Sequence, residues 1–452
     1  MHDYVIIAVY LILIFIFAYN YQTKKLAFNP VYRYYTLALF ARIIGAIALC
    51  LVYEGYYKGG DTVGYYRSSE ALINLLFEKP QAYFKILFGD FSKEILSNFS
   101  RTTGFPWHMD DYESFAVIRV TSIFTFLGFK NYFTTSILFA TFFFIGHWKL
   151  YLLFCQIYPK YYKQFAIAIL FFPSVVFWGS GILKDTITLS SMSWMIYSFY
   201  FVFVKKEKIF KNGLAFIINL IIILSIKPYL VVALLPGIMA WFGWEYLKKI
   251  QNPLGRILVA PFIAAIFLGI GYLLVSLLQG SLGVYGNIYG IIDKAITTYY
   301  DHMRVEQYGA HVYNLGTFDG SVSNFFAKTP VAITAGLFRP FFWDVRTLFM
   351  AISAMENTIL LIFTIIIFWR TGPVKTIKIT FDEPMVIFAL GFALVFAFAV
   401  GISSGNFGAL VRLRTPLLPL FASGLIILLN RSTELKKQRD HSDSKSFDRH
   451  MS

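Results

Sequence analysis

The segment GGDTVGYYR, residues 59–67, surrounds a single carboxylate with glycine and tyrosine residues. Glycines let the chain turn tightly as it leaves the preceding apolar run, so they can hold Asp61 at a membrane surface. A carboxylate in such a place can act as a general base toward a hydroxyl group. The alternative is that Asp61 merely caps the following helix, with Arg67 as its solvated partner. We treat Asp61 as a catalytic candidate and Arg67 as a substrate-binding candidate.

The segment FPSVVFWGSGILKDT, residues 172–186, places Lys184 and Asp185 among apolar residues. Pro173 and the glycines after it disturb a helix, which predicts a break or tight turn here. The lysine can hold a phosphate group while Asp185 sets its orientation. The alternative is a structural ion pair at the turn, although adjacent residues do not face each other on a helix. Both residues are therefore catalytic candidates.

Two further segments, LFRPFFWDVR and GNFGALVRLRTP, combine arginine with aromatic residues or glycine. Arginine is always charged and can bind a phosphate through two parallel hydrogen bonds. Arg412 and Arg414 form the strongest anion-binding candidate, and Arg339 with Asp344 forms a second substrate-binding candidate. The alternatives are an aromatic anchor at a membrane surface and arginines that snorkel toward lipid head groups. The carboxylates of the chain are scattered, so the sequence predicts neither a metal site nor a cofactor.

The composition indicates that helices in a lipid bilayer position these residues. Of the 452 residues, 57% are hydrophobic and 14% are charged, whereas soluble domains are about 25% charged. The formal net charge of +15 does not indicate a nucleic-acid partner, because most Lys and Arg lie in short segments between apolar runs. The sequence therefore predicts an all-α fold, a polytopic transmembrane helical bundle.

About eleven apolar runs are predicted to span the bilayer. These predicted spans are residues 4–19, 36–53, 132–154, 165–182, 186–204, 214–226, 229–244, 257–278, 348–369, 385–401 and 415–429. Basic residues gather in alternate loops, for example at 205–211, and the positive-inside rule makes these loops cytoplasmic. The N-terminus is then outside and the C-terminus inside. A shorter apolar run, residues 115–128, contains Arg119 and is predicted to be an interfacial or re-entrant helix on the outer face.

The domain organisation follows from these spans. Residues 1–430 form a single polytopic membrane domain, and the polar residues 431–452 form a disordered cytoplasmic tail. Two long outer loops, at about 54–131 and 279–347, lie on the same face, and long ordered loops are usually functional. Glu356 falls within the ninth span, where a carboxylate is costly; it can pair with a cation, stay protonated or relay protons.

Several of these segments resemble a known family. GGDTVGYY resembles the G-x-D-x-x-x-Y element of EpsG- and Wzy-type exopolysaccharide and O-antigen polymerases. The stretch DYESFAVIRVTSIFTFLGFKNYF resembles the amphipathic segment that follows in that family, and VRLRTPLLPLFASGL is similar to a C-terminal element of many membrane transferases. A carboxylate in the first outer loop is typical of the wider GT-C class of lipid-sugar-dependent glycosyltransferases. Where the EpsG-type pattern carries an Arg-Gln pair in a middle helix, this chain has Lys184 and Asp185.

The resemblance implies a GT-C-like membrane glycosyltransferase or polysaccharide polymerase in the bacterial cytoplasmic membrane. Its substrate would be a saccharide on polyprenyl phosphate or diphosphate, presented at the outer face. Asp61 would be the base, and Arg412, Arg414 and Arg339 would clamp the leaving phosphate with help from Lys184. Besides the bilayer, other polysaccharide-assembly membrane proteins are candidate partners.

The alternative function is a lipid-linked oligosaccharide flippase or another membrane transporter. Glu356, Arg42 and the broken fourth span would then line a path through the membrane. The sequence shows no internal repeat, and its polar residues gather on one face instead of at the midplane. These two features favour the transferase.

Overall fold

The computed structural model describes residues 2–252, 283–304 and 311–451, together with five single residues between 253 and 282. Within these residues the chain forms helices, and extended backbone pairs only at an isolated bridge between Val312 and Asn406. Eight helices in the described part are long and apolar enough to cross a bilayer, or nine if a bent pair counts as one span. The predicted fold class, an all-α polytopic membrane bundle, is therefore confirmed.

The chain divides into two compact units, Met1–Val231 and Val232–Ser452. Each unit contains several of the apolar helices. The single membrane domain over residues 1–430 stays a prediction.

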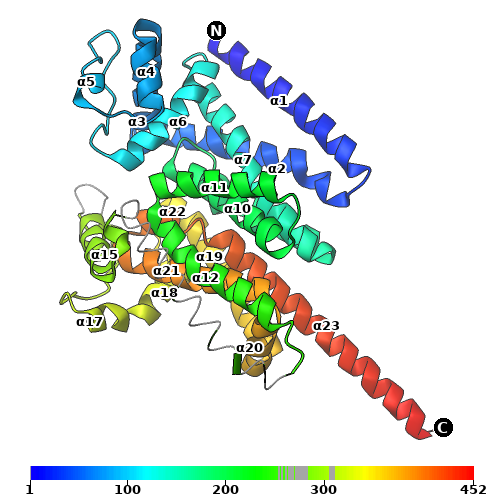
Figure 1. Ribbon diagram of the computed structural model, residues 1–452. Coiled ribbons are helices and arrows are strands. Elements are labelled where there is room, and N and C mark those ends of the chain that lie inside the picture. The colour runs from blue at the N-terminus through cyan, green and yellow to red at the C-terminus, as the bar shows by residue number, and fades with distance from the viewer. Residues whose placement is uncertain are drawn as a thin grey trace. The chain divides into compact units, whose positions relative to one another are not determined.

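Unit 1 is a row of packed helices with a second helical layer built from the first predicted outer loop (Figure 1). Its elements are α1 (His2–Leu26), η1 (Pro30–Tyr34), α2 (Tyr35–Leu51), η2 (Val52–Tyr56), α3 (Asp61–Glu78), α4 (Pro80–Leu87), α5 (Lys93–Leu96), α6 (Tyr112–Leu127), α7 (Tyr132–Ile157), η3 (Pro159–Tyr161), α8 (Tyr162–Phe165), η4 (Ala166–Leu170), α9 (Pro173–Trp178), α10 (Lys184–Phe199), η5 (Tyr200–Val204) and α11 (Ile209–Ile226).

The row runs through contacts of α1 with α2, α2 with α7, α7 with α10, and α10 with α11. Helices α7 and α10 come close because Gly146 lies against the backbone of Ser190, where a larger residue would collide. Helix α1 leaves most of its apolar side chains exposed, as expected of a helix that faces lipid. Helix α3 packs on α6. The segment 115–128 therefore lies in a helix that covers α3, and its depth in the bilayer stays a prediction.

The fourth predicted span, residues 165–182, is not a continuous helix. It consists of the end of α8, the π-helix η4 that continues directly from it, and the short α9, which follows two irregular residues. Pro173 supplies no amide hydrogen, and the residue before it is extended. The guanidinium of Arg42 in α2 donates to the carbonyl oxygens of Val175 (2.6 Å) and Gly179 (3.0 Å) at the end of α9, where Val175 also accepts the backbone N–H of Gly179 (3.1 Å). The sequence analysis predicted a break or tight turn at this point, and the helical backbone is interrupted directly before Pro173. Whether residues 165–182 cross the bilayer stays a prediction.

Unit 2 contains the remaining described elements. They are α12 (Pro228–Leu247), whose first residues belong to unit 1, and η6 (Gly283–Gly286), α15 (Ile288–His302), α17 (Val322–Ala327), α18 (Thr329–Phe338), η7 (Phe342–Asp344), α19 (Leu348–Thr371), α20 (Pro373–Asp382), α21 (Pro384–Ser403), α22 (Phe407–Leu413) and α23 (Leu418–Met451).

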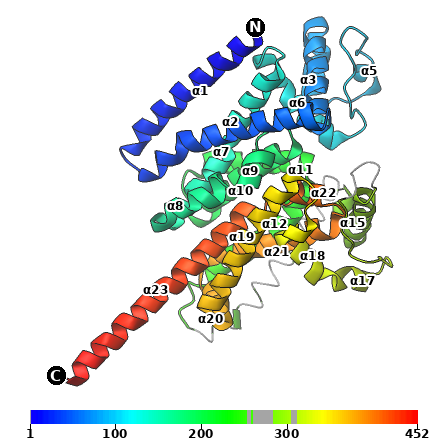
Figure 2. The same ribbon diagram turned by 180° about the vertical axis from the view of Figure 1, so that it is seen from behind.

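Helix α21 is the centre of unit 2, since it packs against α18 on one side and α23 on another. Gly336 of α18 and Gly401 of α21 each lie against the backbone of the other helix, so small residues again set the close approach. Helices α19 and α20 also contact α23 (Figure 2). Helix α23 continues into the tail after residue 430, where Arg431 contacts Glu383 at 2.7 Å. The disorder of the tail as a whole stays a prediction.

Most predicted spans correspond to a helix. The span at 257–278 falls almost entirely outside the described residues. Apart from it and the broken fourth span, each predicted span overlaps an apolar helix. The last span, 415–429, overlaps a bent pair, Phe407–Leu413 and Leu418–Gln438, whose two parts meet at 65°. The total number of spans and their orientation stay predictions.

Reporter fusions test the orientation. We expect fusions after Lys208 and after Lys249 to report the cytoplasm, because basic residues are retained on that side. Fusions after Lys93 and after Ser321, in the two long loops, should report the outside. A cytoplasmic signal from the Lys93 fusion would contradict the assignment of the outer face.

Candidate functional site

Asp61 begins α3 directly after a glycine turn. Gly59 and Gly60 have φ values of 146° and 108°, which other residues rarely adopt. At Gly60 a Cβ atom would also lie 2.9 Å from the ring of Tyr53. Gly60 occupies the N-cap, so Asp61 stands at the first helical position and is not the capping residue. There its half-buried carboxylate is stabilised by the positive end of the helix dipole.

Tyr65 connects this part of α3 to the start of α6. It lies one turn after Asp61 on the same helix face, and its phenol oxygen is 3.3 Å from Ser114 Oγ. Ser114 Oγ donates to Asp111 Oδ2. Asp111 is the N-cap of α6, since its Oδ1 accepts the backbone N–H of Glu113 (3.1 Å) and of Ser114 (3.2 Å). The glycine-flanked segment and the start of α6 are thus joined by side-chain hydrogen bonds.

Lys184 opens α10 and reaches the same carboxylates. Its Nζ lies 3.4 Å from Asp111 Oδ2 and 3.5 Å from Glu113 Oε2. The lysine side chain is 17% exposed and each carboxylate side chain is 45% exposed. Both contacts are long for charged hydrogen bonds, so the ammonium can exchange a carboxylate for another anion at little cost. We call Lys184, Asp111, Glu113 and Ser114 the Lys184 cluster.

The protonation of Asp111 follows from this environment. Partial burial raises the pKa of the carboxyl, but the hydrogen bond from Ser114 and the charge of Lys184 outweigh burial and hold the pKa below its usual range. Asp111 is therefore ionised at neutral pH and is a weak proton acceptor.

Asp185 pairs with a lysine that the sequence analysis did not select. Lys227 Nζ lies 2.5 Å from Asp185 Oδ1, and the two side chains are 6% and 1% exposed. Lys227 stands at the junction of α11 and α12, a turn between two apolar helices. A charge in so short a turn is the signal that could have identified it. The pairing also shows that Lys184 and Asp185 do not simply neutralise each other.

In unit 2, Arg339 and Asp344 form a two-pronged pair. Arg339 Nε and Nη2 donate to the two carboxylate oxygens at 3.1 and 2.8 Å, and the backbone N–H of Phe341 donates to Oδ2 at 2.9 Å. The guanidinium carbon lies 4.8 Å from the ring centre of Phe407 and 5.4 Å from that of Tyr313. The sequence selected Arg339 and Asp344 as one candidate, and the structure brings them into direct contact.

The Arg339–Asp344 pair makes the stability of unit 2 depend on pH. Burial raises the pKa of Asp344, but the hydrogen bonds from Arg339 and Phe341 outweigh it and keep the pKa below its usual range. A depressed pKa stabilises the fold above the unfolded value of about 4 and loses that contribution as the pH falls through the folded pKa. We expect Asp344→Asn to lower the midpoint of thermal unfolding at pH 7 by a few degrees. At pH 2.5 the difference in unfolding temperature between the variant and the wild type should be smaller than at pH 7. If the unfolding temperatures of the variant and the wild type differed by the same amount at both pH values, the Arg339–Asp344 pair would not be the source of the pH dependence.

Arg414 is fully buried and already has protein partners. Its Nη1 donates to the carbonyl oxygens of Arg339 (2.9 Å) and Leu337 (3.5 Å), and its Nη2 donates to Asn357 Oδ1. The carboxylate of Glu356 is near enough to stabilise its charge. These contacts favour a positioning role, in which Arg414 holds the backbone that carries Arg339. Arg412 is half-buried at the end of α22 and is the more accessible member of the predicted pair.

The two arginines should therefore respond differently to substitution. We expect Arg414→Ala to reduce the amount of folded protein strongly, because it leaves Asn357 and two carbonyl groups without a buried donor. Arg412→Ala should accumulate normally and lose activity. The measurements are the monodisperse fraction in detergent and transfer activity at matched protein level. Normal accumulation of Arg414→Ala would contradict the positioning role.

The candidate site residues fall into two sets, one in each unit. Unit 1 holds Asp61, Arg67, Lys184 and Asp185; unit 2 holds Arg339, Asp344, Arg412 and Arg414. Within unit 1, Asp61 and Lys184 are linked through α6, whereas Arg67 is exposed on α3. Among the described residues no group of three or more His, Cys, Asp or Glu side chains is arranged to hold a metal ion.

No family model, curated protein sequence or solved structure matches this chain. The functional argument therefore depends on the geometry of the residues themselves.

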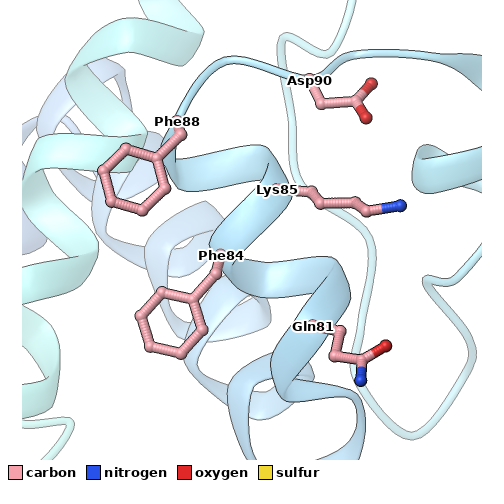
Figure 3. A pocket seen from close by; sticks show the side chains of 5 residues that line it. All are labelled: Gln81, Phe84, Lys85, Phe88 and Asp90. Atoms are coloured by element: carbon pink, nitrogen blue, oxygen red, sulfur yellow. The ribbon is translucent and has the colours of Figure 1, made fainter.

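A shallow depression of about 530 Å³ on α4 is separate from the candidate residues. Figure 3 shows Phe84 and Phe88 on one side of this helix, with Gln81, Lys85 and Asp90 on the other. Aromatic side chains beside a polar edge are typical of a helix at a bilayer surface. None of these five residues belongs to the Lys184 cluster, so the depression is not part of the site.

Proposed function

We propose that this chain is a membrane glycosyltransferase of the polysaccharide polymerase type. Its donor would be a saccharide linked to polyprenyl phosphate or diphosphate, used at the outer face of the bacterial cytoplasmic membrane. The observation that supports this most is the Lys184 cluster. It joins a lysine at the start of α10 to the carboxylates at the start of α6 and, through Tyr65, to the helix that Asp61 begins.

The reaction needs two kinds of group, and unit 1 supplies both. The oxygen of an acceptor hydroxyl attacks the anomeric carbon of the donor, the bond from that carbon to the phosphate oxygen breaks, and the hydroxyl proton moves to a base. In our proposal Asp61 takes the proton. The polyprenyl phosphate or diphosphate leaves with one more negative charge than it had in the donor. Lys184 offsets that charge by turning from its carboxylates toward the phosphate.

The contacts around Lys184 suit this exchange. Its two partners are half-exposed and lie at 3.4 and 3.5 Å, so neither is a closed buried pair. The neighbouring Asp185–Lys227 pair is buried and short, and it fixes the first turn of α10 beneath Lys184. The first turn of α10 is thus held in place while the Lys184 ammonium stays loosely paired. This arrangement suits an ammonium that binds the leaving phosphate for a short time.

In unit 2, Arg412 stays our candidate for binding a phosphate group. Its side chain is half-buried. Two residues further on, Arg414 donates a hydrogen bond to the backbone carbonyl of Arg339 and so connects α22 to that segment. An arginine can offer a phosphate two parallel hydrogen bonds, which a lysine cannot. Arg412→Lys should therefore recover only part of the activity that Arg412→Ala loses.

Deletion of the gene in its source organism tests the proposal. We expect lipid-linked saccharide to accumulate at the outer face, where a membrane-impermeant oxidant can modify it, and the polymer to shorten or disappear. Wild-type protein should restore the polymer, and Lys184→Ala at equal abundance should not. Accumulation at the inner face, protected from the oxidant, would instead indicate a flippase and contradict the proposal.

A further inference from the structure

Trp107 is an exposed aromatic side chain held against the helix face that carries Asp61. It lies in the loop before α6, and 52% of its surface is accessible. Its backbone N–H donates to Ser68 Oγ at 2.8 Å, and Ser68 itself is buried. Asp61, Gly64 and Ser68 are spaced so that they share one face of α3. The backbone hydrogen bond therefore attaches the chain at Trp107 to that face.

Gly64 makes room for the indole ring. A Cβ atom at this position would lie 3.1 Å from Trp107 Cε3, closer than side chains normally approach. The Cε3–Cζ3 edge of the indole thus packs against a glycine three residues after Asp61. About half of the side chain stays accessible (52%).

The backbone next to Trp107 is unusual. His108 has a φ of 60°, in the left-handed region that non-glycine residues rarely adopt. Its ring centre lies 5.8 Å from that of Tyr65, the residue that links α3 to Ser114. Uncommon backbone conformations persist where the surroundings enforce them, and they gather at functional sites. This turn directs the chain from Trp107 into Asp111 and the Lys184 cluster.

We propose that Trp107 is the platform on which a pyranose ring of the saccharide stacks. The face of an aromatic ring carries partial negative charge and attracts the weakly positive C–H groups on one face of a sugar. The hydroxyls at the rim of that sugar can then donate to the carboxylates of Asp61 and Glu113. Stacking would hold the acceptor hydroxyl near its base. This inference depends on the proposed function for its choice of a saccharide as ligand.

A tryptophan that only anchors a protein at the bilayer surface is the competing explanation. Such an anchor needs no glycine beneath it and would not affect saccharide binding. The test therefore measures binding directly, in a form that does not require transfer to occur.

The full-length protein is placed in nanodiscs of phosphatidylethanolamine and phosphatidylglycerol. The probe is a soluble oligosaccharide, the repeating unit released by mild acid from the surface polysaccharide of the source organism. Calorimetry and saturation-transfer NMR compare the wild type with Trp107→Leu and Trp107→Phe. Leu is apolar but has no aromatic face, whereas Phe keeps one. Trp369→Leu is the matched control, because Trp369 is also exposed (85%) and lies in the other unit.

We expect Trp107→Leu to weaken binding about tenfold, Trp107→Phe to stay within about threefold of the wild type, and Trp369→Leu to have no effect. Unchanged binding by Trp107→Leu, equal losses by the Phe and Leu variants, or no binding by the wild type would each overturn the inference. A wild type that binds the saccharide through Trp107 but catalyses no transfer would overturn the proposed function and leave the platform intact. Thermal unfolding of each variant confirms that it is folded.

Discussion

Replacement of Asp61 by Asn is expected to lower the rate of glycosyl transfer by about 10²–10⁴-fold while the protein accumulates normally. The amide has nearly the same size as the carboxylate but cannot accept the proton of an acceptor hydroxyl. Asp61 stands at the first position of α3, and Gly60 is the N-cap, so the substitution removes no capping hydrogen bond. The N-cap of α3 is therefore unchanged in the variant.

The assay is transfer of saccharide in isolated membranes at matched protein level. Asp110→Asn is the matched control, since it changes an exposed aspartate in the neighbouring loop and should leave transfer unchanged. Wild-type turnover by Asp61→Asn would exclude Asp61 as the base. Glu113, which is half-exposed in the Lys184 cluster, would then be the next carboxylate to replace.

Lys227→Met is expected to destabilise the protein by about 3–5 kcal/mol, because it leaves the carboxylate of Asp185 buried without its cation. The side chains of this pair are 1% and 6% exposed, so water cannot replace the lost partner in place. The double variant Asp185→Asn with Lys227→Met removes both charges and should recover much of the lost stability. The free energy of unfolding can be measured by titration with sodium dodecyl sulfate in mixed micelles.

Lys184→Met, measured by the same detergent titration, distinguishes the buried pair from the catalytic candidate Lys184. Lys184→Met removes a lysine that is 17% exposed and loosely paired, so its effect on stability should be far smaller than that of Lys227→Met. Two results would contradict a stabilising role of the buried pair at the start of α10. Lys227→Met could unfold at the same detergent fraction as the wild type, or the addition of Asp185→Asn could fail to restore the stability that Lys227→Met loses.

The apolar runs of the sequence predicted nearly all of the described spanning helices, because a bilayer demands long uninterrupted apolar segments. Residues 165–182 are apolar but form no long helix, and Pro173 with the glycines after it had predicted a break there. Pro173 lacks an amide hydrogen, and Arg42, 133 residues from Val175, supplies the hydrogen bonds that the broken helix needs. Composition cannot reveal a partner at that separation.

The candidate residues were selected because charge is rare in such a chain, but their partners were not predictable. Lys184 contacts Asp111 and Glu113 across separations of 73 and 71 residues, a consequence of how α6 and α10 pack. Arg414 is of a residue type that often binds anions, yet in the folded protein its guanidinium donates to Asn357 and to backbone carbonyls. The residue type indicates which interactions a side chain can make, and tertiary packing determines which groups it contacts.

Reconstitution of the purified protein with a polyprenyl diphosphate-linked saccharide tests the central claim most directly. The measurement follows two products in proteoliposomes, the released polyprenyl diphosphate and the lengthened saccharide. We predict that wild-type protein releases one polyprenyl diphosphate for each glycosidic bond that it forms, and that Asp61→Asn and Lys184→Ala form neither product at a comparable rate. Movement of intact lipid-linked saccharide from one leaflet to the other, without release of polyprenyl diphosphate, would contradict glycosyl transfer and identify a transporter.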